Sequence, residues 1–401
     1  MSFTVQSKQL VKVTTSEVYY AFTNATALTE WMCDYATVAP HPGGRMYLWW
    51  HGDFYSAGEY VALEKDRSVT FKWQGRFDPA PSEILVDLQA KKDGTLVTMS
   101  HTVPDGEDWK ERAHNFKEEW NATLANLAQV LETGIDKRTY DRPMLGININ
   151  DFNAQIAKSM GVPVDQGIRL DSLIEEMGAY KAGLRPDDVI VQLEGKPITN
   201  DFGSLVIALQ GKKGGDRVEV VYYRGPQRKT TSMELSKRPI PKIPWDPDEL
   251  SKLLRMKYDQ ALAQLDDVFT GVSESQAELR PSPNEWNAKE TLAHLIQNER
   301  HWLEHLDDVI AGYARVSDDW GGNSTIHVRA TAAAFHTVRA MLDELAHLAD
   351  EMVAYTAELP ESFMTRKASY FQMVNTLLEG SLPHIPAHLE QIKAAIRTKG
   401  S

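Results

Sequence analysis

Histidine spacing gives this chain its clearest capacity for chemistry. His384 and His388 are four residues apart, so on a helix their imidazoles share one face and can aim at one point. Imidazole nitrogens suit zinc, nickel, copper and iron as ligands. Pro383 and Pro386 flank His384, and a proline inside a helix removes a hydrogen bond. If the last helix began at Pro386, the shared face would be lost. The pair therefore indicates either metal ligands or structural histidines.

The elements around these histidines are predicted to be helices. After a proline-rich linker, apolar residues recur at helical spacing over 248–269, over a helix opened by the capping box 287–290, over 329–359 and over 367–397. A polar loop is expected at 312–328. Four helices with short or polar connections predict an all-α four-helix bundle over residues 245–399.

Two segments of this region, EWNAKETLAHL (285–295) and HIPAHLEQI (384–392), resemble the DinB-like bundle family. In its metal-binding members, one histidine of the second helix joins two of the last helix. By motif position the resemblance implies His294, His384 and His388 as ligands of one divalent transition metal, zinc or nickel, with an open coordination position. His301 and His305 share the stripe of His294 but have no motif position, and we expect them to be solvated or half-buried.

The middle of the chain has a β pattern rich in glycine and proline. It contains RPMLGI (142–147), AGLRPDDVI (182–190) and QLEGKPI (192–198), which together indicate a compact β module. Adjacent main-chain amides at a turn can hold an anion, and a strand edge can accept another strand. Apolar spacing predicts a helix over 201–209 and a strand over 218–223.

These motifs resemble a PDZ domain of the bacterial HtrA type over residues 141–240. The resemblance implies a β-barrel-like fold that binds the C-terminus of a peptide or protein on the amides of the Leu-Gly-Ile run. The groove residues that it implies are Met144, Leu145, Gly146, Ile147, Phe202, Leu205, Val206 and Leu209. Asp187 stands where such domains carry glycine, and it would need a positive φ. The alternative is a buried strand at 144–147 that binds nothing.

Residues 1–138 alternate between apolar and polar side chains in short runs. A capping box at 14–17 predicts a first helix. Strands are expected at 45–50, 56–63, 68–74, 83–90 and 95–102, separated by hairpin turns. A long amphipathic helix is expected over 109–132, with Gly134 as its C-cap. A helix, an antiparallel sheet and a closing helix make a helix-grip fold.

The segments AFTN (21–24), PGGR (42–45), GEY (58–60) and FKW (71–73) resemble the START-like (SRPBCC) superfamily, in its branch related to activators of the heat-shock ATPase chaperone. The resemblance implies a cavity for a small apolar ligand between the sheet and the long helix. The aromatic residues expected to line it are Trp31, Tyr47, Trp49, Trp73, Phe116 and Trp120. The alternative is that these side chains only fill a core.

Composition fits a multidomain α+β protein and excludes several partners. The 401 residues carry a net charge of −13, and an acidic chain without a basic stripe argues against nucleic acid and anionic membranes. No apolar run is long enough to cross a bilayer, and the first residues lack a signal pattern, so we expect a cytoplasmic protein. The single cysteine, Cys33, fits a reducing compartment.

The sequence contains no nucleophilic triad, phosphate loop, dinucleotide fingerprint or paired-cysteine metal motif. Our first hypothesis is therefore an intracellular multidomain binding or adaptor protein. The second is a metal-dependent thiol transferase or isomerase, because in some DinB-like bundles the metal polarises a thiol. The third is a chaperone cofactor that works through the first domain. Whether the protein catalyses any reaction stays open.

Overall fold

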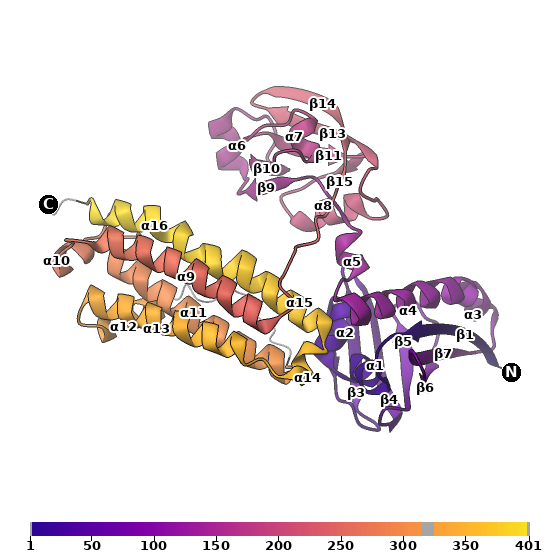
Figure 1. The fold of residues 1–401 in the computed structure, drawn as a ribbon. Coiled ribbons are helices and arrows are strands. Elements are labelled where there is room, and N and C mark those ends of the chain that lie inside the picture. Colours follow the sequence, from indigo (N-terminus) through magenta and orange to yellow (C-terminus); the bar gives the residue numbers. More distant parts are fainter. Residues whose placement is uncertain (1, 314–324, 399–401) are drawn as a thin grey trace. The chain divides into compact units, whose positions relative to one another are not determined.

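The computed structural model describes residues 2–313 and 325–398 and divides the chain into two compact units (Figure 1). One unit comprises residues 51–53 and 135–240, and the other comprises 1–50, 54–134 and 241–401. The first and last regions of the sequence therefore belong to one unit. Most of the polar loop expected at 312–328 lies outside the described residues.

A seven-stranded antiparallel sheet forms the N-terminal part of the larger unit, in the order β1-β7-β6-β5-β4-β3-β2. The strands are β1 (Ser2–Val11), β2 (Tyr35–Val38), β3 (Arg45–Trp50), β4 (Phe54–Glu64), β5 (Ser68–Gly75), β6 (Ser82–Lys91) and β7 (Gly94–Pro104). Buried and exposed residues alternate along β6 and β7, so one face of the sheet packs on the core. Sequence patterns did not predict β1 or β2.

Four helices and a 3₁₀ turn accompany this sheet. They are α1 (Thr15–Thr23), α2 (Ala25–Trp31), α3 (Glu107–Arg112), η1 (Ala113–Asn115) and α4 (Phe116–Thr133). The capping box predicted at 14–17 is present, with Thr14 as N-cap, and Gly134 ends α4 at a φ of +78°. The single helix expected over 109–132 is corrected: the 3₁₀ turn η1 divides it, and only α4 packs along β1.

The second unit is a small β domain. Its main sheet has the order β14-β13-β11-β10-β9, with β12 paired to β11, and β8 pairs with β15. The elements are α5 (Lys137–Tyr140), β8 (Pro143–Met144), β9 (Ile147–Asn150), α6 (Ala154–Met160), β10 (Ile168–Leu173), α7 (Gly178–Lys181), β11 (Val189–Leu193), β12 (Lys196–Pro197), α8 (Phe202–Leu209), β13 (Arg217–Arg224), β14 (Gln227–Glu234) and β15 (Ser236–Lys237). Because β9 is the last strand of the sheet order, one of its edges is unpaired within the sheet.

The turn at Asp187 has the geometry that the missing glycine would have supplied. Asp187 adopts a φ of +68°, and its carboxylate accepts hydrogen bonds from Arg169 at 2.6 and 2.9 Å. The next residue, Asp188, is fully buried and binds the guanidinium of Arg224 through both oxygens at 2.8 Å. These ion pairs hold the turn although Asp187 tolerates a left-handed backbone less well than glycine.

Long helices make up the C-terminal part of the larger unit. They are α9 (Pro247–Phe269), α10 (Glu274–Ala277), α11 (Ala288–Ala311), α12 (Thr325–Ala334), α13 (Val338–Ala357), α14 (Glu361–Met364), α15 (Lys367–Thr376) and α16 (Leu382–Ile396). The capping box predicted at 287–290 opens α11. The single helix expected over 329–359 is corrected, because Thr337 caps a new helix at Val338 and separates α12 from α13.

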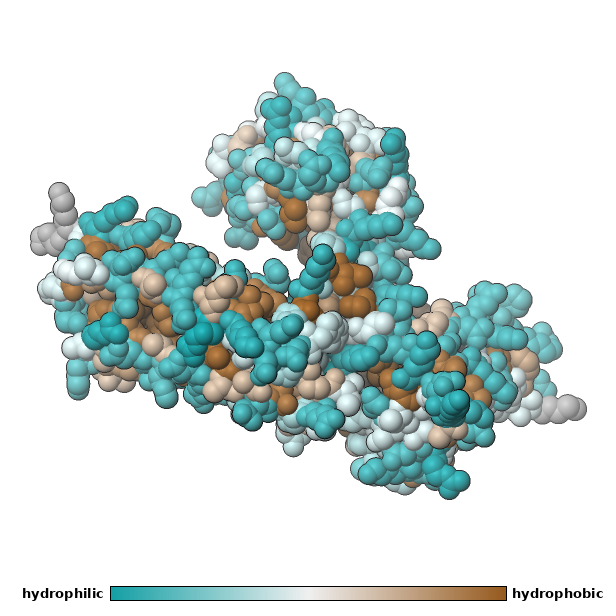
Figure 2. Space-filling view, viewed as in Figure 1, coloured by the Kyte–Doolittle hydropathy of each residue, from teal (hydrophilic) through white to brown (hydrophobic). Residues whose placement is uncertain are grey.

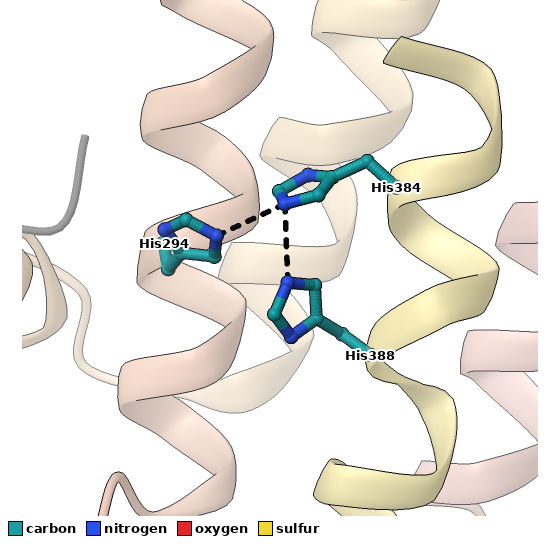
Figure 3. A group of neighbouring side chains, drawn as sticks. All are labelled: His294, His384 and His388. Atoms are coloured by element: carbon teal, nitrogen blue, oxygen red, sulfur yellow. Dashed lines mark hydrogen bonds between the residues drawn. The ribbon is translucent and has the colours of Figure 1, made fainter. Parts of the chain in front are cut away.

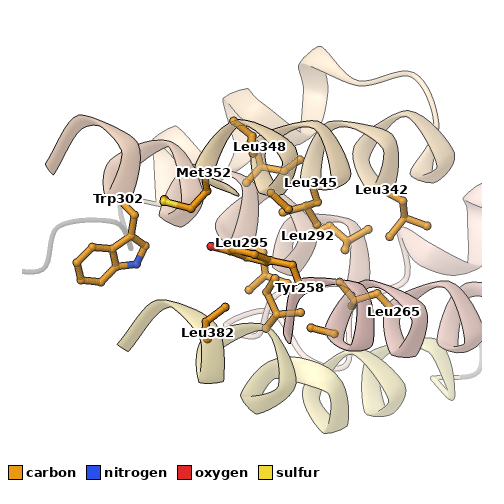
Figure 4. Close-up of a cluster of buried hydrophobic side chains, with 14 of the residues drawn as sticks. Tyr258, Leu265, Leu292, Leu295, Trp302, Leu342, Leu345, Leu348, Met352 and Leu382 are labelled. Carbon is orange, nitrogen blue, oxygen red and sulfur yellow. The ribbon is translucent and has the colours of Figure 1, made fainter. Parts of the chain in front are cut away.

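Apolar side chains from the four long helical segments fill the centre of the bundle (Figure 4). Leu265, Leu292 and Leu345 are among the core residues and are almost completely buried. Buried polar groups lie among these apolar residues. The Tyr258 hydroxyl donates to the buried carboxylate of Glu299 at 2.7 Å, and Ser381 lies 3.2 Å from the same hydroxyl. The Gln297 amide donates to the Thr331 hydroxyl at 2.8 Å. Close packing of the apolar side chains fixes the rotation of each helix.

The last two helices are joined through a π-helical turn, η3 (Leu377–Ser381), so α15, η3 and α16 form one continuous helical segment. Pro386 lies inside α16 and does not begin it. We attribute the π turn to the prolines that follow, since Pro383 and Pro386 have no N–H and each crowds the carbonyl four residues before it. The residue added by a π turn rotates the following helix by about 100°, so η3 sets the direction of the α16 side chains.

The N-terminal sheet part and the helical bundle share a seam within the larger unit. Ala368 of α15 belongs to the hydrophobic core of the sheet part. Asn24 donates to the carbonyl of Gly312 at 2.9 Å, and Arg366 donates to the Tyr20 hydroxyl at 2.9 Å. The buried carboxyl of Glu30 accepts a hydrogen bond from Ser369 at 2.5 Å. Apolar packing and these polar contacts together bind the two parts.

Hydrophilic residues cover most of the face seen in Figure 2, as expected for a chain in which a quarter of the residues are charged. Among the helices of residues 2–313 and 325–398, we find no segment with the length and apolar character that crossing a membrane requires.

The seam predicts a pH-dependent stability. Burial raises the pKa of the Glu30 carboxyl to about 7, although the Ser369 hydrogen bond and the Arg366 charge lower it. Folding therefore takes up a proton at Glu30, and this contribution to stability is present at low pH and lost as pH rises through about 7. We expect Glu30→Gln to flatten the fall in melting temperature between pH 5 and pH 8, by an amount equivalent to roughly 2–3 kcal/mol.

Melting curves of both proteins across this pH range provide the measurement. Glu118→Gln, which changes an exposed carboxyl on α4, is the matched control and should leave the wild-type slope unchanged. Part of the fall in melting temperature with pH remains in both variants, because burial also raises the pKa of Glu299 to about 7. An identical slope in wild type and Glu30→Gln would show that Glu30 ionises normally.

Candidate functional site

Three histidines meet between two helices of the bundle (Figure 3). His294 lies on α11, whose N-terminus is fixed by the Asn287–Glu290 capping box, and its side chain is buried. His384 and His388 lie one turn apart on α16, because the helix continues through Pro386. The structure therefore brings together the three residues that the family motif implied, and it leaves the i,i+4 geometry of the last pair intact.

The three rings present their Nε2 atoms to one another. The Nε2 of His384 lies 3.1 Å from the Nε2 of His294 and 3.1 Å from the Nε2 of His388. The ligand atoms of all three lie within 4.8 Å of one another. Nitrogens that share one metal at about 2.1 Å are separated by roughly 3–4 Å. The two separations of 3.1 Å therefore match those of ligands around a common centre.

Hydrogen bonding alone leaves this arrangement unsatisfied. A ring nitrogen has a single site in the plane of the ring, which carries either one hydrogen or one lone pair. The Nε2 of His384 therefore cannot form good hydrogen bonds to two imidazoles at once. In addition, its buried Nδ1 has no hydrogen-bond partner among residues 2–313 and 325–398. A cation at the focus of three lone pairs resolves the conflict, so the residues fit a metal ion.

A further residue sets the orientation of His388. Its Nδ1 lies 2.7 Å from Oε1 of Gln391, three residues along the same helix. The Nδ1–H donates to this oxygen, and the neutral ring then carries its lone pair on Nε2, toward the other histidines. Such a second contact fixes the tautomer of a metal ligand. Sequence reasoning missed this role, although the i,i+3 spacing of His388 and Gln391 could have indicated it.

Electrostatics favour the neutral form of the central ring. Burial, together with the neighbouring His388 and His294, lowers the pKa of His384 to about 4. The His384 imidazole is therefore neutral at pH 7, which is the form that binds a metal. Three neutral imidazoles with an open fourth position are typical of catalytic or ligand-exchanging zinc sites, in contrast to the closed sites of structural zinc.

The other histidines of α11 are separate from this cluster. His301 and His305 are half-buried, and each packs edge-on against Trp302, with ring centroids at 6.1 and 5.6 Å. His294 instead packs against Trp286, at 5.0 Å. No other group of histidine, cysteine and carboxylate side chains in the described part of the chain meets the same spacing.

Backbone hydrogen bonds orient the loop before β9 in the second unit. The carbonyl oxygens of Leu145 and Gly146 accept hydrogen bonds from the amides of Ala179 and Ile174, at 2.8 and 2.9 Å. In a trans peptide the following N–H points the opposite way. The amides of Gly146 and Ile147 therefore point away from these partners. Gly146 has a φ of +78°, and a Cβ there would lie 2.2 Å from the Cβ of Met177.

The other residues of the predicted groove lie on β8, β9 and α8. Met144 pairs with Ser236 in the small two-stranded sheet. On α8, Leu205 is buried, whereas Phe202 and Val206 are 54% and 38% exposed. Leu209 and Ile147 are partly buried against the core of this unit. An exposed apolar helix surface is the kind of surface that a bound peptide covers.

A cavity of about 320 Å³ lies in the N-terminal part of the larger unit. Trp73, Phe116 and Trp120 line it, as predicted. Its other lining residues are Met32, Trp50, Phe54, His101, Arg112, Glu119 and Thr123. Trp31, by contrast, is fully packed beside Phe22 and donates its N–H to the carbonyl of Ala21, so its assignment to the cavity is corrected.

The prediction for Tyr47 and Trp49 is also corrected. Side chains alternate along β3, and Met46 and Leu48 are the ones that are buried. Trp50 therefore has the inward phase, whereas Tyr47 stacks on Tyr55 outside the cavity. A shift of one residue in a strand moves every side chain to the other face. Placing Met46 and Leu48 on the inner face of β3 would have given the correct phase.

Comparison with protein families gives a class to each part. Residues 12–132 match the family described as "Activator of Hsp90 ATPase homolog 1-like protein", residues 143–235 match the PDZ domain family, and residues 257–391 match the DinB superfamily. The protein is therefore a multidomain α+β protein with START-like (SRPBCC), PDZ and DinB-like domains. The resemblances stated from sequence motifs are confirmed.

Curated relatives match the PDZ region alone. The periplasmic pH-dependent serine endoprotease DegQ of Escherichia coli is 31% identical over 100 residues, which are 25% of this chain and 22% of DegQ. The periplasmic serine endoprotease DegP of Salmonella typhimurium is 31% identical over 108 residues, 27% of this chain and 22% of DegP. The chain thus spans about a fifth of the length of these relatives.

Comparison with solved structures finds similarity to about a third of this chain. The Aha1 dimer from Colwellia psychrerythraea is 19% identical and covers 32% of this chain and 96% of its own, with a TM-score of 0.29. An Hsp90 activator from Plasmodium falciparum is 24% identical and covers 33% of this chain and 96% of its own, with a TM-score of 0.27.

We predict that His388→Ala loses metal. It removes one of three ligands, and His388 lies beyond both prolines on a regular helix. The measurement is the metal content of wild type and variant purified without added metal, where we expect about one zinc or nickel ion in wild type. His301→Ala and His305→Ala are the matched controls and should change the content little. A triple alanine variant of His294, His384 and His388 that keeps the wild-type content would refute the site.

Gln391→Ala should weaken metal binding without removing a ligand. The loss of the acceptor for the His388 Nδ1–H frees the ring to rotate and to change tautomer. Loss of such a contact typically costs 10–100-fold in metal affinity. Competition with a chelator measures the affinity. Glu390→Ala, which removes the exposed neighbour paired with Lys393, serves as control. Gln391→Glu keeps an acceptor and should restore binding; equal affinities for all three variants would contradict the assignment.

Proposed function

We propose that this protein is a multidomain binding protein with three separate ligands. Its DinB-like bundle holds one divalent transition metal ion through His294, His384 and His388. Its PDZ domain binds the C-terminus of a peptide or protein, and its START-like domain holds a small apolar ligand. The observation that carries the proposal is the meeting of three Nε2 atoms, two of them each 3.1 Å from the third.

The metal-binding role rests on the donor set. Three neutral imidazoles suit zinc and nickel, and copper and iron less specifically, so zinc or nickel is the proposed ion. When bound, the ion supplies a Lewis acid with one open position. The chain's own residues hold that position open, because His294, His384 and His388 approach from two helices only and no carboxylate or cysteine of the described residues joins them.

The peptide-binding role rests on the loop at Leu145–Ile147 and on the exposed apolar face of α8. Two amides that point away from the domain can hold a carboxylate, and the unpaired edge of β9 can add a strand. Each side-chain pocket contributes only a few kcal/mol, and ordering the peptide costs part of that gain, so we expect micromolar affinity.

A hexapeptide with a C-terminal valine, prepared as free acid and as amide, tests this role. We expect the free acid to bind the full chain with micromolar affinity in calorimetry and the amide not to bind, because amidation removes the charge that the nest recognises. Val206→Glu on the groove side of α8 should weaken binding at least tenfold. Ile207→Glu, an exposed neighbour outside the predicted groove, is the control. Equal binding of both peptide forms would rule out carboxylate recognition.

A second candidate function is a metal-dependent thiol transferase or isomerase. The open position at the three histidines favours it, since a thiol bound there would lose its proton and become a nucleophile. The thiol would have to come from a second substrate, because Cys33 is fully buried in the START-like domain. Addition of a small thiol to cobalt-loaded protein distinguishes the two functions: a thiolate-to-metal absorption band supports the enzyme, and an unchanged spectrum supports the binding protein.

A chaperone-cofactor role stays a weaker proposal. It rests on the match of residues 12–132 to the Hsp90-activator family, and co-purification with that chaperone would test it. A cytoplasmic location is also part of the proposal. It rests on the single cysteine, which is compatible with a reducing compartment.

A further inference from the structure

The cavity of the START-like domain has aromatic walls. Trp73 lies edge-on to Trp50 at 6.0 Å and to Trp120 at 5.6 Å, and Trp50 packs against Phe54 at 5.3 Å. At about 320 Å³ the cavity lies at the small end of the range for ligand pockets. Flat, rigid rings face the space on several sides, so a planar ligand would gain the most contact.

The inner end of the cavity carries a histidine that is locked in its neutral form. The Trp120 N–H donates to Nδ1 of His101 at 3.1 Å, so Nδ1 is an acceptor and the ring hydrogen is on Nε2. That Nε2–H donates to the Ser82 hydroxyl at 2.7 Å, and Ser82 donates to the carbonyl of Trp73 at 3.0 Å. Burial, with the charge of Arg112, lowers the pKa of His101 to about 4. This end therefore offers a ligand neither charge nor an unused proton.

The only cation of the cavity lining is Arg112, and its charge is already balanced. Its Nε donates to the buried carboxylate of Asp78 at 3.1 Å, and its guanidinium lies 4.8 Å from the ring centre of Phe116. A second carboxylate, Glu119, stands 4.0 Å away, which is too far for a hydrogen bond. Asp78 balances the charge of Arg112 and Glu119 adds a negative charge, so an anion gains no net attraction. The Glu119 side chain is 53% exposed, so solvent screens its attraction for a cation, and the guanidinium of Arg112 repels one.

Hydrogen-bond donors nevertheless remain. A guanidinium has five N–H groups, and Asp78 is the only hydrogen-bond acceptor of Arg112 among the described residues. The cavity thus combines apolar walls with donors that need an acceptor. An uncharged oxygen can supply one without the cost of burying a charge.

We infer that this cavity binds an uncharged planar aromatic molecule that carries a carbonyl or ether oxygen at the edge facing Arg112. The inference rests on the small-ligand role proposed above and specifies its chemistry. The aromatic walls select the ring system, the neutral His101 end accommodates its apolar part, and Arg112 selects the acceptor.

Four naphthalenes of one shape and different polarity test the inference on the full chain by calorimetry. They are 2-acetylnaphthalene (neutral acceptor), 2-ethylnaphthalene (no acceptor), naphthalene-2-carboxylate (anion) and 2-naphthylmethylammonium (cation). A hydrogen bond from a charged donor is worth about 1.5–3 kcal/mol, so we expect the ketone to bind at least tenfold more tightly than the ethyl compound. We expect both ions to bind at least tenfold more weakly than the ketone.

Two variants locate the contact. Thr123→Trp on the cavity-facing side of α4 should abolish binding of all four compounds, whereas Thr4→Trp on the exposed face of β1 should not. Arg112→Gln combined with Asp78→Asn removes both charges of the pair without leaving one buried alone, and it should reduce the ketone's advantage over the ethyl compound. A melting curve confirms that each variant is folded.

The outcomes separate this inference from the small-ligand role. If the ethyl compound binds as well as the ketone, and Thr123→Trp abolishes both, the cavity binds ligands but does not select an acceptor, and the inference is wrong. Tightest binding of the carboxylate or of the ammonium compound would also overturn it. If no compound binds, or if Thr123→Trp changes nothing, both the inference and the small-ligand role fail.

Discussion

The candidate metal site depends on a simple property of imidazole: each ring nitrogen has one in-plane site for a partner. Two Nε2 atoms lie 3.1 Å from the Nε2 of His384, and one lone pair or one hydrogen cannot satisfy both. His294 is buried, and His384 and His388 are half-buried. A cation between the three nitrogens would satisfy their lone pairs at once. This conflict is the physical basis of the metal site that we propose for the DinB-like bundle.

Helix rotation is what brings the three nitrogens to one place. A capping box fixes the start of α11, and close packing of its apolar stripe fixes its rotation. On the other side, η3 adds a residue to the turn before α16, and a shift of one residue turns a helix by about 100°. Without that turn, His384 and His388 would keep their i,i+4 relation but would point elsewhere. Pro383 and Pro386, which interrupt the helical pattern of the sequence, therefore help to orient the two histidines of α16.

Sequence patterns predicted local features and missed those that depend on distant partners. The capping residues Thr14 and Asn287, the C-cap Gly134 and the positive φ of Asp187 involve neighbours only, and the structure has them. The edge strand β1 pairs with β7 about ninety residues away, and this distant pairing leaves no local signal in the sequence. The orientation of β3 was assigned one residue out of phase, because five aromatic or apolar residues in succession hide the alternation. The role of Gln391 needed the rotamer of His388, which no sequence pattern contains.

Each of the three candidate sites offers a ligand one kind of partner. The histidine cluster presents lone pairs, which suit the proposed metal ion. The loop at Gly146 and Ile147 presents amide hydrogens in a turn, which suit the proposed peptide carboxylate. The START-like cavity presents N–H donors whose positive charge Asp78 already balances, and this favours a neutral acceptor. In each case the protein's own hydrogen bonds consume the opposite kind of group: Gln391 holds the His388 N–H, Ala179 and Ile174 hold the loop carbonyls, and the Trp120 N–H occupies the acceptor Nδ1 of His101. The selectivity that we propose for the three sites rests on which groups the fold has already satisfied.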